Sequence, residues 1–193
     1  MNELCMMAIS TAAKAILVPA VTFVVGLLIM RVASGHRYVR QQLRERATPP
    51  HHRQLNMRLC GYDATAVGRH WGVLDARALE IERRFLLWDL AFPLAYGWAF
   101  VVALQQTWAA LDNNLPLLLF LIPVGITVIA DWTENLIHLA QLKIYAERGM
   151  AGLDPGRIRV ASIATSVKLS FFFGTFFLIV VLAVCVICSA NCF

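Results

Sequence analysis

The chain has 193 residues, of which 59% are hydrophobic and 15% are charged. Soluble domains average about 45–50% apolar and about 25% charged residues, so this composition excludes an ordinary soluble domain and indicates an integral membrane protein. The length allows a single domain, residues 1–193. We expect an all-α domain, because backbone groups in hydrocarbon need internal partners and four segments are too few to close a barrel.

The first apolar run predicts a membrane helix over about residues 7–30. The positive charges that flank it, Arg31, Arg37 and Arg40, follow the run. A signal peptide carries positive charge before its apolar run. The order found here favours an uncleaved helix whose N-terminus lies outside.

The polar segment 31–84 is predicted to be a cytoplasmic loop that contains an amphipathic helix. Its apolar stripe follows helical spacing through Val67, Trp71, Leu74, Ala78 and Ile81. Two placements stay open, because the stripe can lie on the inner membrane surface or pack against the protein's own helices. The histidines of this segment are expected to be solvated and not metal ligands: His51, His52 and His70.

Three further apolar segments predict membrane helices over about residues 85–111, 115–142 and 160–187. Pro93 is expected to kink the second helix. Residues 112–114 are expected to form a tight turn. Residues 143–159 hold several Gly and Pro residues and are predicted to form a second cytoplasmic loop.

The distribution of charge predicts the topology. Of the 17 Lys and Arg residues, eleven lie in residues 31–84 and four in residues 143–159. The positive-inside rule then places both loops in the cytoplasm and both termini outside, and we expect a multi-pass protein of a bacterial cytoplasmic membrane. The expected partner is the lipid bilayer, with a homo-oligomer or a membrane-protein partner left open. No nucleic acid is expected, because the basic stretch lacks interleaved aromatic residues.

The cysteines do not follow a zinc-binding pattern, and no metal or cofactor is expected. Cys185 and Cys188 lie in an apolar run, which favours small apolar residues in a membrane helix. If the C-terminus faces an oxidising compartment, Cys188 or Cys192 is a candidate partner for Cys5.

Ionisable side chains inside the predicted spans are the most informative feature of the sequence. Helical spacing places those of the third span on one face, and those of the second span on another. An isolated charge costs about 2.5–3.5 kcal/mol at the centre of a membrane helix, so these groups are expected to face inward. The candidate site is a buried polar cluster from three spans: Asp89, Tyr96, Asp131, Glu134, Asn135, His138 and Lys168.

Within this cluster, Lys168 is expected to pair with Glu134 or Asp131. Asp89 is expected to be held by a polar neighbour, either His138, Asn135 or Tyr96. Three carboxyl groups face one lysine, so a retained proton, a cation or His138 must compensate. The cluster is then either a structural contact that fixes the helices, or a site that responds to protons or cations or forms the floor of a ligand pocket.

Residues 84–97 and 131–135 carry two short elements, read as L-D-x-x-F-P-x-x-Y, with Trp88 at the leucine position, and D-x-x-E-N. They resemble an uncharacterised family of small bacterial integral membrane proteins over about residues 62–142. The resemblance implies no activity. It points to five residues of the same candidate cluster: Asp89, Tyr96, Asp131, Glu134 and Asn135.

Three functions remain open from the sequence. The first, which we expect, is a small binding or transport-type helical bundle with the polar cluster near the inner leaflet. The second is a membrane-embedded enzyme that acts on a lipid, although no H-E-x-x-H, phosphate-binding Gly loop or Ser/His/Asp set is present and no catalytic residue is assigned. The third is an accessory or assembly subunit that binds its partner through the amphipathic segment.

Overall fold

The computed structural model describes residues 3–46, 55, 58–111 and 116–190. Every regular element in these residues is a helix. Four helical segments are long and apolar enough to cross a membrane: Glu3–Ala33, Ala76–Ala110, Leu118–Gly152 and Pro155–Ser189. The prediction of an all-α chain with four such helices is confirmed.

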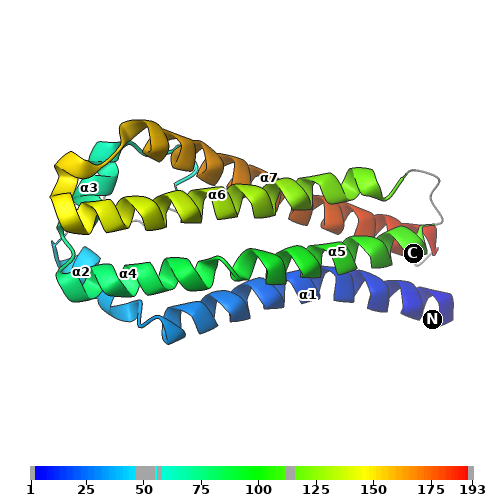
Figure 1. The fold of residues 1–193 in the computed structure, drawn as a ribbon. Coiled ribbons are helices and arrows are strands. Elements are labelled where there is room, and N and C mark those ends of the chain that lie inside the picture. The colour runs from blue at the N-terminus through cyan, green and yellow to red at the C-terminus, as the bar shows by residue number, and fades with distance from the viewer. Residues whose placement is uncertain (1–2, 47–54, 56–57, 112–115, 191–193) are drawn as a thin grey trace.

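The long helices are α1 (Glu3–Ala33), α5 (Phe92–Ala110), α6 (Leu118–Arg148) and α7 (Pro155–Ser189). They run side by side as a bundle, and α4 (Ala76–Asp89) extends α5 in line (Figure 1). The short helices α2 (Arg37–Arg46) and α3 (Ala64–Gly72) lie at one end of the bundle. The first residues of α1 and the last residues of α7 lie at the opposite end (Figure 1).

Aspartate caps set where several helices begin. Asp75 Oδ1 accepts from Ala78 N–H at 2.8 Å and starts α4, while Asp154 Oδ1 accepts from Gly156 N–H at 2.8 Å and starts α7 at Pro155. An Asp cap followed by Pro is a strong helix start. The second loop is therefore shorter than residues 143–159, because α6 continues to Arg148 and only η2 (Gly149–Gly152) and its flanks separate it from α7.

The apolar stripe of residues 67–81 packs against the protein's own helices. It falls in α3 and the first half of α4, which are separate helices. Val67, Trp71 and Ala78 are at most 1% exposed and belong to a core that includes Leu142 of α6 and Ile158 of α7. His70 is 1% exposed, so the prediction that it is solvated is wrong. His51 and His52 lie outside the described residues.

The cysteine predictions are answered in part. Cys5 is disulfide-bonded. Cys60, Cys185 and Cys188 are free, so Cys188 is not the disulfide partner of Cys5. Cys192, the other candidate, lies outside the described residues, as does the predicted turn at residues 112–114.

Asp75 also links α4 to α2, and this link gives a testable pH dependence. The Tyr38 hydroxyl donates to Asp75 Oδ2 at 2.7 Å, which holds the pKa of Asp75 below its usual range, and the Ala78 N–H adds to this effect. A carboxylate with a lowered folded-state pKa stabilises the fold above its unfolded-state pKa of about 3.9 and loses that contribution as the pH falls.

We therefore expect Asp75→Asn to lower the Tm at about pH 6, and the difference from the wild type to shrink towards about pH 3. Asparagine retains the Oδ1 cap on Ala78 but replaces Oδ2, which accepts from Tyr38 and Gln42, so the substitution removes the charge together with these two hydrogen bonds. Thermal melts of the detergent-purified proteins at several pH values measure this difference. A difference that stays constant with pH would show that the carboxylate charge contributes nothing.

Candidate functional site

A break in the second membrane-spanning segment brings the two motif elements of the sequence together. Pro93 has no N–H, so the main-chain oxygen of Asp89, four residues earlier, lacks its helical partner. Asn135 Nδ2 donates to this oxygen at 3.2 Å. Trp132 Nε1 donates to the oxygen of Leu90 at 2.8 Å. Two side chains of α6 thus satisfy the carbonyl groups that the break leaves free.

Lys168 of α7 lies between two carboxylates of α6. Its Nζ is 3.1 Å from Asp131 Oδ1 and also donates to Glu134 Oε2. The Lys168 side chain is 10% exposed and that of Glu134 is fully buried. The sequence left the partner open between Glu134 and Asp131, and the structure pairs Lys168 with both.

Asp131 is the most highly connected member of the cluster. Its Oδ1 accepts from Lys168 and from Asn135 Nδ2 at 3.1 Å, and its Oδ2 accepts from the Tyr96 hydroxyl at 2.8 Å. Glu134 Oε1, in contrast, is buried without a hydrogen-bond partner in the described part of the chain. Asp131 therefore links α5, α6 and α7 at one point.

Asp89 is 4% exposed and is held by Asn135, one of the three neighbours that the sequence left open. Tyr96 bonds Asp131, and His138 bonds Tyr62. Asn135 reaches the main-chain oxygen of Asp89, as described above. No hydrogen bond joins Asp89 to Lys168 among the described residues, so of the three carboxylates it is the one that the lysine does not bind.

His138 connects the cluster's helix to the polar loop. Its Nε2 lies 2.8 Å from the hydroxyl of Tyr62, which lies 3.1 Å from Thr165 Oγ1. The Thr165 hydroxyl donates to the oxygen of Ala161, so the Tyr62 hydroxyl donates to Thr165 and accepts from His138. Burial raises the pKa of Tyr62 above its usual range, which keeps this hydroxyl neutral.

The loop before α3 is fixed across α7 by further polar contacts. The Tyr62 N–H donates to Ser162 Oγ at 2.8 Å, and Ser166 Oγ donates to the oxygen of Leu59 at 2.9 Å. Gly61 has a φ of 80°, and an added Cβ would lie 2.7 Å from Ser162 Oγ. Only glycine fits this close approach. The sequence gave no signal for these contacts, because their partners are about one hundred residues apart.

A cavity of about 120 Å³ adjoins the cluster inside the bundle. Asp89, Asp131 and Lys168 line it, and Arg31 of α1 contributes a further charge. Its remaining walls are aliphatic or aromatic side chains from α1, α4, α5 and α7. The aromatic side chains are Phe23, Phe85, Phe92, Tyr96, Phe172 and Phe173.

The formal charges around this cavity do not balance. Asp89, Asp131 and Glu134 carry three formal negative charges. The cations beside them are Lys168, which pairs with Asp131 and Glu134, and Arg31, which shares the cavity lining with Asp89 and Asp131. The Nε of Arg31 is buried without a hydrogen-bond partner in the described residues. The sequence reasoning had used Arg31 only to predict the topology. One positive charge is missing, and a buried uncompensated carboxylate is costly. The arrangement therefore suits one proton or one monovalent cation beside Asp89.

A second buried polar group lies towards the end of the bundle that carries α2 and α3. Glu82 of α4 lies 2.9 Å from His36 Nε2 and 4.0 Å from His70 Nε2. These residues join the turn between α1 and α2 to α3 and α4. The sequence reasoning missed them because it took the segment as solvated. The sequence does carry one signal that His70 is buried: it directly precedes Trp71, a residue of the apolar stripe.

Trp132→Phe tests the contact that satisfies the helix break. Phenylalanine keeps an aromatic side chain, although a smaller one, and removes the donor, so the part-buried oxygen of Leu90 loses its partner, at a cost of about 1–3 kcal/mol. We expect a clear fall in unfolding free energy, measured by denaturant titration in detergent. Trp98→Phe is the matched control, because Trp98 is 70% exposed. Equal effects of the two substitutions would show that the hydrogen bond is unimportant.

No group of three or more His, Cys, Asp or Glu residues in the described part of the chain is placed to hold a metal ion. The two elements that resemble the uncharacterised family are the ones that meet at the Pro93 break. Comparisons of the chain with protein-family models, curated proteins and solved structures find no match.

Proposed function

We propose that this chain is a small membrane protein of the binding or transport type, whose cavity takes up a small organic cation beside Asp89. Following the positive-inside rule, its basic loops lie in the cytoplasm and both termini outside, in a bacterial cytoplasmic membrane. One observation carries the proposal: a carboxylate that the lysine does not bind lines a cavity with aromatic walls.

The charge of the site supports a cationic ligand. Lys168 already bonds Asp131 and Glu134, so it is not available to Asp89. A proton can occupy the Asp89 carboxyl group when the cavity holds no cation. A bound monovalent cation would replace that proton and keep the same net charge. Cation and proton then compete for one position.

The walls and size of the cavity support an organic ammonium group. Aromatic faces attract ammonium groups, and this effect is stronger where water is excluded. Phe172 packs against Phe23 and Tyr96, with ring centroids 4.8 Å and 5.4 Å apart. The volume of about 120 Å³ is small, which favours a compact ligand. A compact alkylammonium ion fits this description better than a hydrated metal ion.

The other two hypotheses have less support. The accessory-subunit hypothesis relied on the amphipathic segment as a contact surface, and that stripe is buried in the protein's own core. The lipid-enzyme hypothesis needs an activated nucleophile or a general base. Here Asp131 and Lys168 are already hydrogen-bonded to other members of the cluster.

The proposal is tested by ligand-induced thermal shifts of the detergent-purified protein. Tetramethylammonium is expected to raise the Tm, whereas sodium at equal ionic strength and neutral tert-butanol are not. In Asp89→Asn the half-saturating concentration should rise at least about tenfold, because the amide supplies no charge. Glu45→Gln, which alters an exposed carboxylate on α2, should respond as the wild type does.

Either of two results would remove the proposal. One is a wild type that no ammonium ion stabilises at any pH. The other is an Asp89→Asn protein that tetramethylammonium stabilises as well as it does the wild type, since the ion would then bind outside this cavity.

A further inference from the structure

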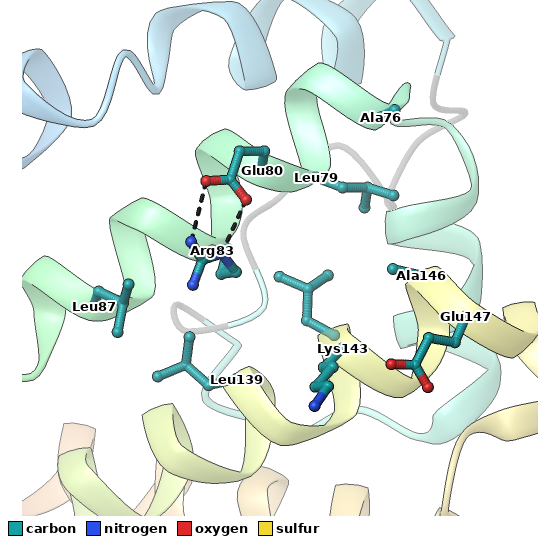
Figure 2. A pocket seen from close by; sticks show the side chains of 10 residues that line it. Ala76, Leu79, Glu80, Arg83, Leu87, Leu139, Lys143, Ala146 and Glu147 are labelled. Atoms are coloured by element: carbon teal, nitrogen blue, oxygen red, sulfur yellow. Dashed lines mark hydrogen bonds and ion pairs between the residues drawn. The ribbon is translucent and has the colours of Figure 1, made fainter.

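A second cavity lies between α4 and α6, at the end of the bundle that carries α2 and α3, and it is separate from the polar cluster. Its volume is about 540 Å³, which falls in the usual range for ligand sites. Figure 2 shows Leu87 and Leu139 at one end of this groove, and Ala76 and Ala146 at the other.

Both walls of the groove repeat one order of side chains. Along α4, from the membrane outward, the order is Leu87, Arg83 and Glu80. Along α6 it is Leu139, Lys143 and Glu147. The two helices run in opposite directions, and Leu87 and Leu139 lie at the same end of the groove, whereas Glu147 lies beside Ala146 at the other end (Figure 2). Successive residues of each series are three or four apart, which puts them on one helix face.

We expect these residues to lie near the inner boundary of the membrane, where basic residues gather. Leu87, which is 44% exposed, lies in the apolar part of the second span. Arg83 lies four residues further out, about 6 Å along the helix. On α6, Lys143 likewise lies four residues further out than Leu139. The groove therefore passes from hydrocarbon depth, through a basic level, to an acidic level beyond it.

The charges of the groove are incompletely paired within the chain. Glu80 binds both Arg83 at 2.9 Å and Arg84 at 3.1 Å, so this group carries one excess positive charge. Lys143 and Glu147 are exposed and form no ion pair in the described part of the chain. A cationic level and an acidic level thus remain open to a ligand.

We propose that this groove binds a phospholipid with a primary-amine headgroup of the ethanolamine type. An acyl chain lies along Leu87 and Leu139, and the phosphate binds between Arg83 and Lys143. The headgroup ammonium, which lies two carbons beyond the phosphate, donates to Glu147. The order apolar, basic, acidic in the groove matches the order acyl chain, phosphate, ammonium in the lipid.

The test compares three short-chain lipids added to lipid-free protein in detergent: phosphatidylethanolamine, phosphatidylcholine and phosphatidylglycerol. The ethanolamine lipid should raise the Tm at a concentration about tenfold lower than the others, because choline has no N–H donor and glycerol has no charge. Arg83→Gln/Lys143→Gln should weaken the response about tenfold. Glu147→Gln should abolish the preference for the ethanolamine headgroup. Arg40→Gln/Arg44→Gln on α2 is the control, expected to respond as the wild type.

Three results would overturn the inference. The three lipids could stabilise the protein equally, or the α2 control could weaken binding as much as the groove variant. Alternatively, stability could depend on protein concentration and not on lipid, which would place a second copy in the groove. The titrations are repeated in Asp89→Asn, whose lipid response should be unchanged, so the outcome is independent of the proposed cation site.

Discussion

Lys168→Met is expected to lower the unfolding free energy by about 3–5 kcal/mol, the usual cost of removing one partner from a buried ion pair. The substitution leaves the buried carboxylates of Asp131 and Glu134 without their shared cation. Adding Glu134→Gln to Lys168→Met should restore about half or more of the loss, because it removes one of the unpaired charges. Denaturant titration in detergent measures both effects.

Lys14→Met is the matched control, because Lys14 is an exposed lysine on α1. Lys14→Met should change the unfolding free energy by no more than about 0.5 kcal/mol. If the double variant is no more stable than Lys168→Met alone, the charges are not coupled. The cluster would then stabilise the bundle through packing and not through charge pairing.

Trp71→Ala is expected to cost about 3–5 kcal/mol, because it opens a large cavity in a packed core. Trp71 is 1% exposed and contacts the rings of Tyr145 and His138, with centroids 5.5 Å and 6.2 Å apart. It packs α3 against α6 through these two rings. Loss of this contact should also increase amide hydrogen exchange across α3, measured by mass spectrometry.

Trp98→Ala removes an equally large side chain from the outside of the bundle, where Trp98 is 70% exposed. It should change stability by less than about 1 kcal/mol. A Trp71→Ala protein that is as stable as Trp98→Ala, with α3 still protected, would show that α3 is held by other contacts.

The sequence predicts the membrane helices well, because hydropathy and charge depend on local composition. It also predicts which charged residues share a helix face, since the spacing of Asp131, Glu134 and Asn135 follows from helix geometry. The helix limits are less accurate. The extension of α4 back to Ala76 and the start of α7 at Pro155 are set by Asp caps in polar segments, where hydropathy gives no signal.

Contacts between distant segments are not predictable in this way. His138 is bonded by Tyr62, a loop residue 76 positions away, and not by a neighbour in the membrane. Trp132 donates to the carbonyl group of Leu90. This group is free of a helical partner because the helix breaks between α4 and α5, next to Pro93. Arg31 joins the cavity because α1 packs beside α7, which no pattern within α1 indicates.

The coupling of cation binding to proton release tests the central claim, that a single uncompensated carboxylate beside the cavity defines the site. Tetramethylammonium is titrated into the detergent-purified protein by calorimetry, in two buffers with different ionisation enthalpies. The account predicts release of about one proton for each cation bound at neutral pH, and no release in Asp89→Asn. Cation binding without proton release, or with the same release in Asp89→Asn, would contradict it.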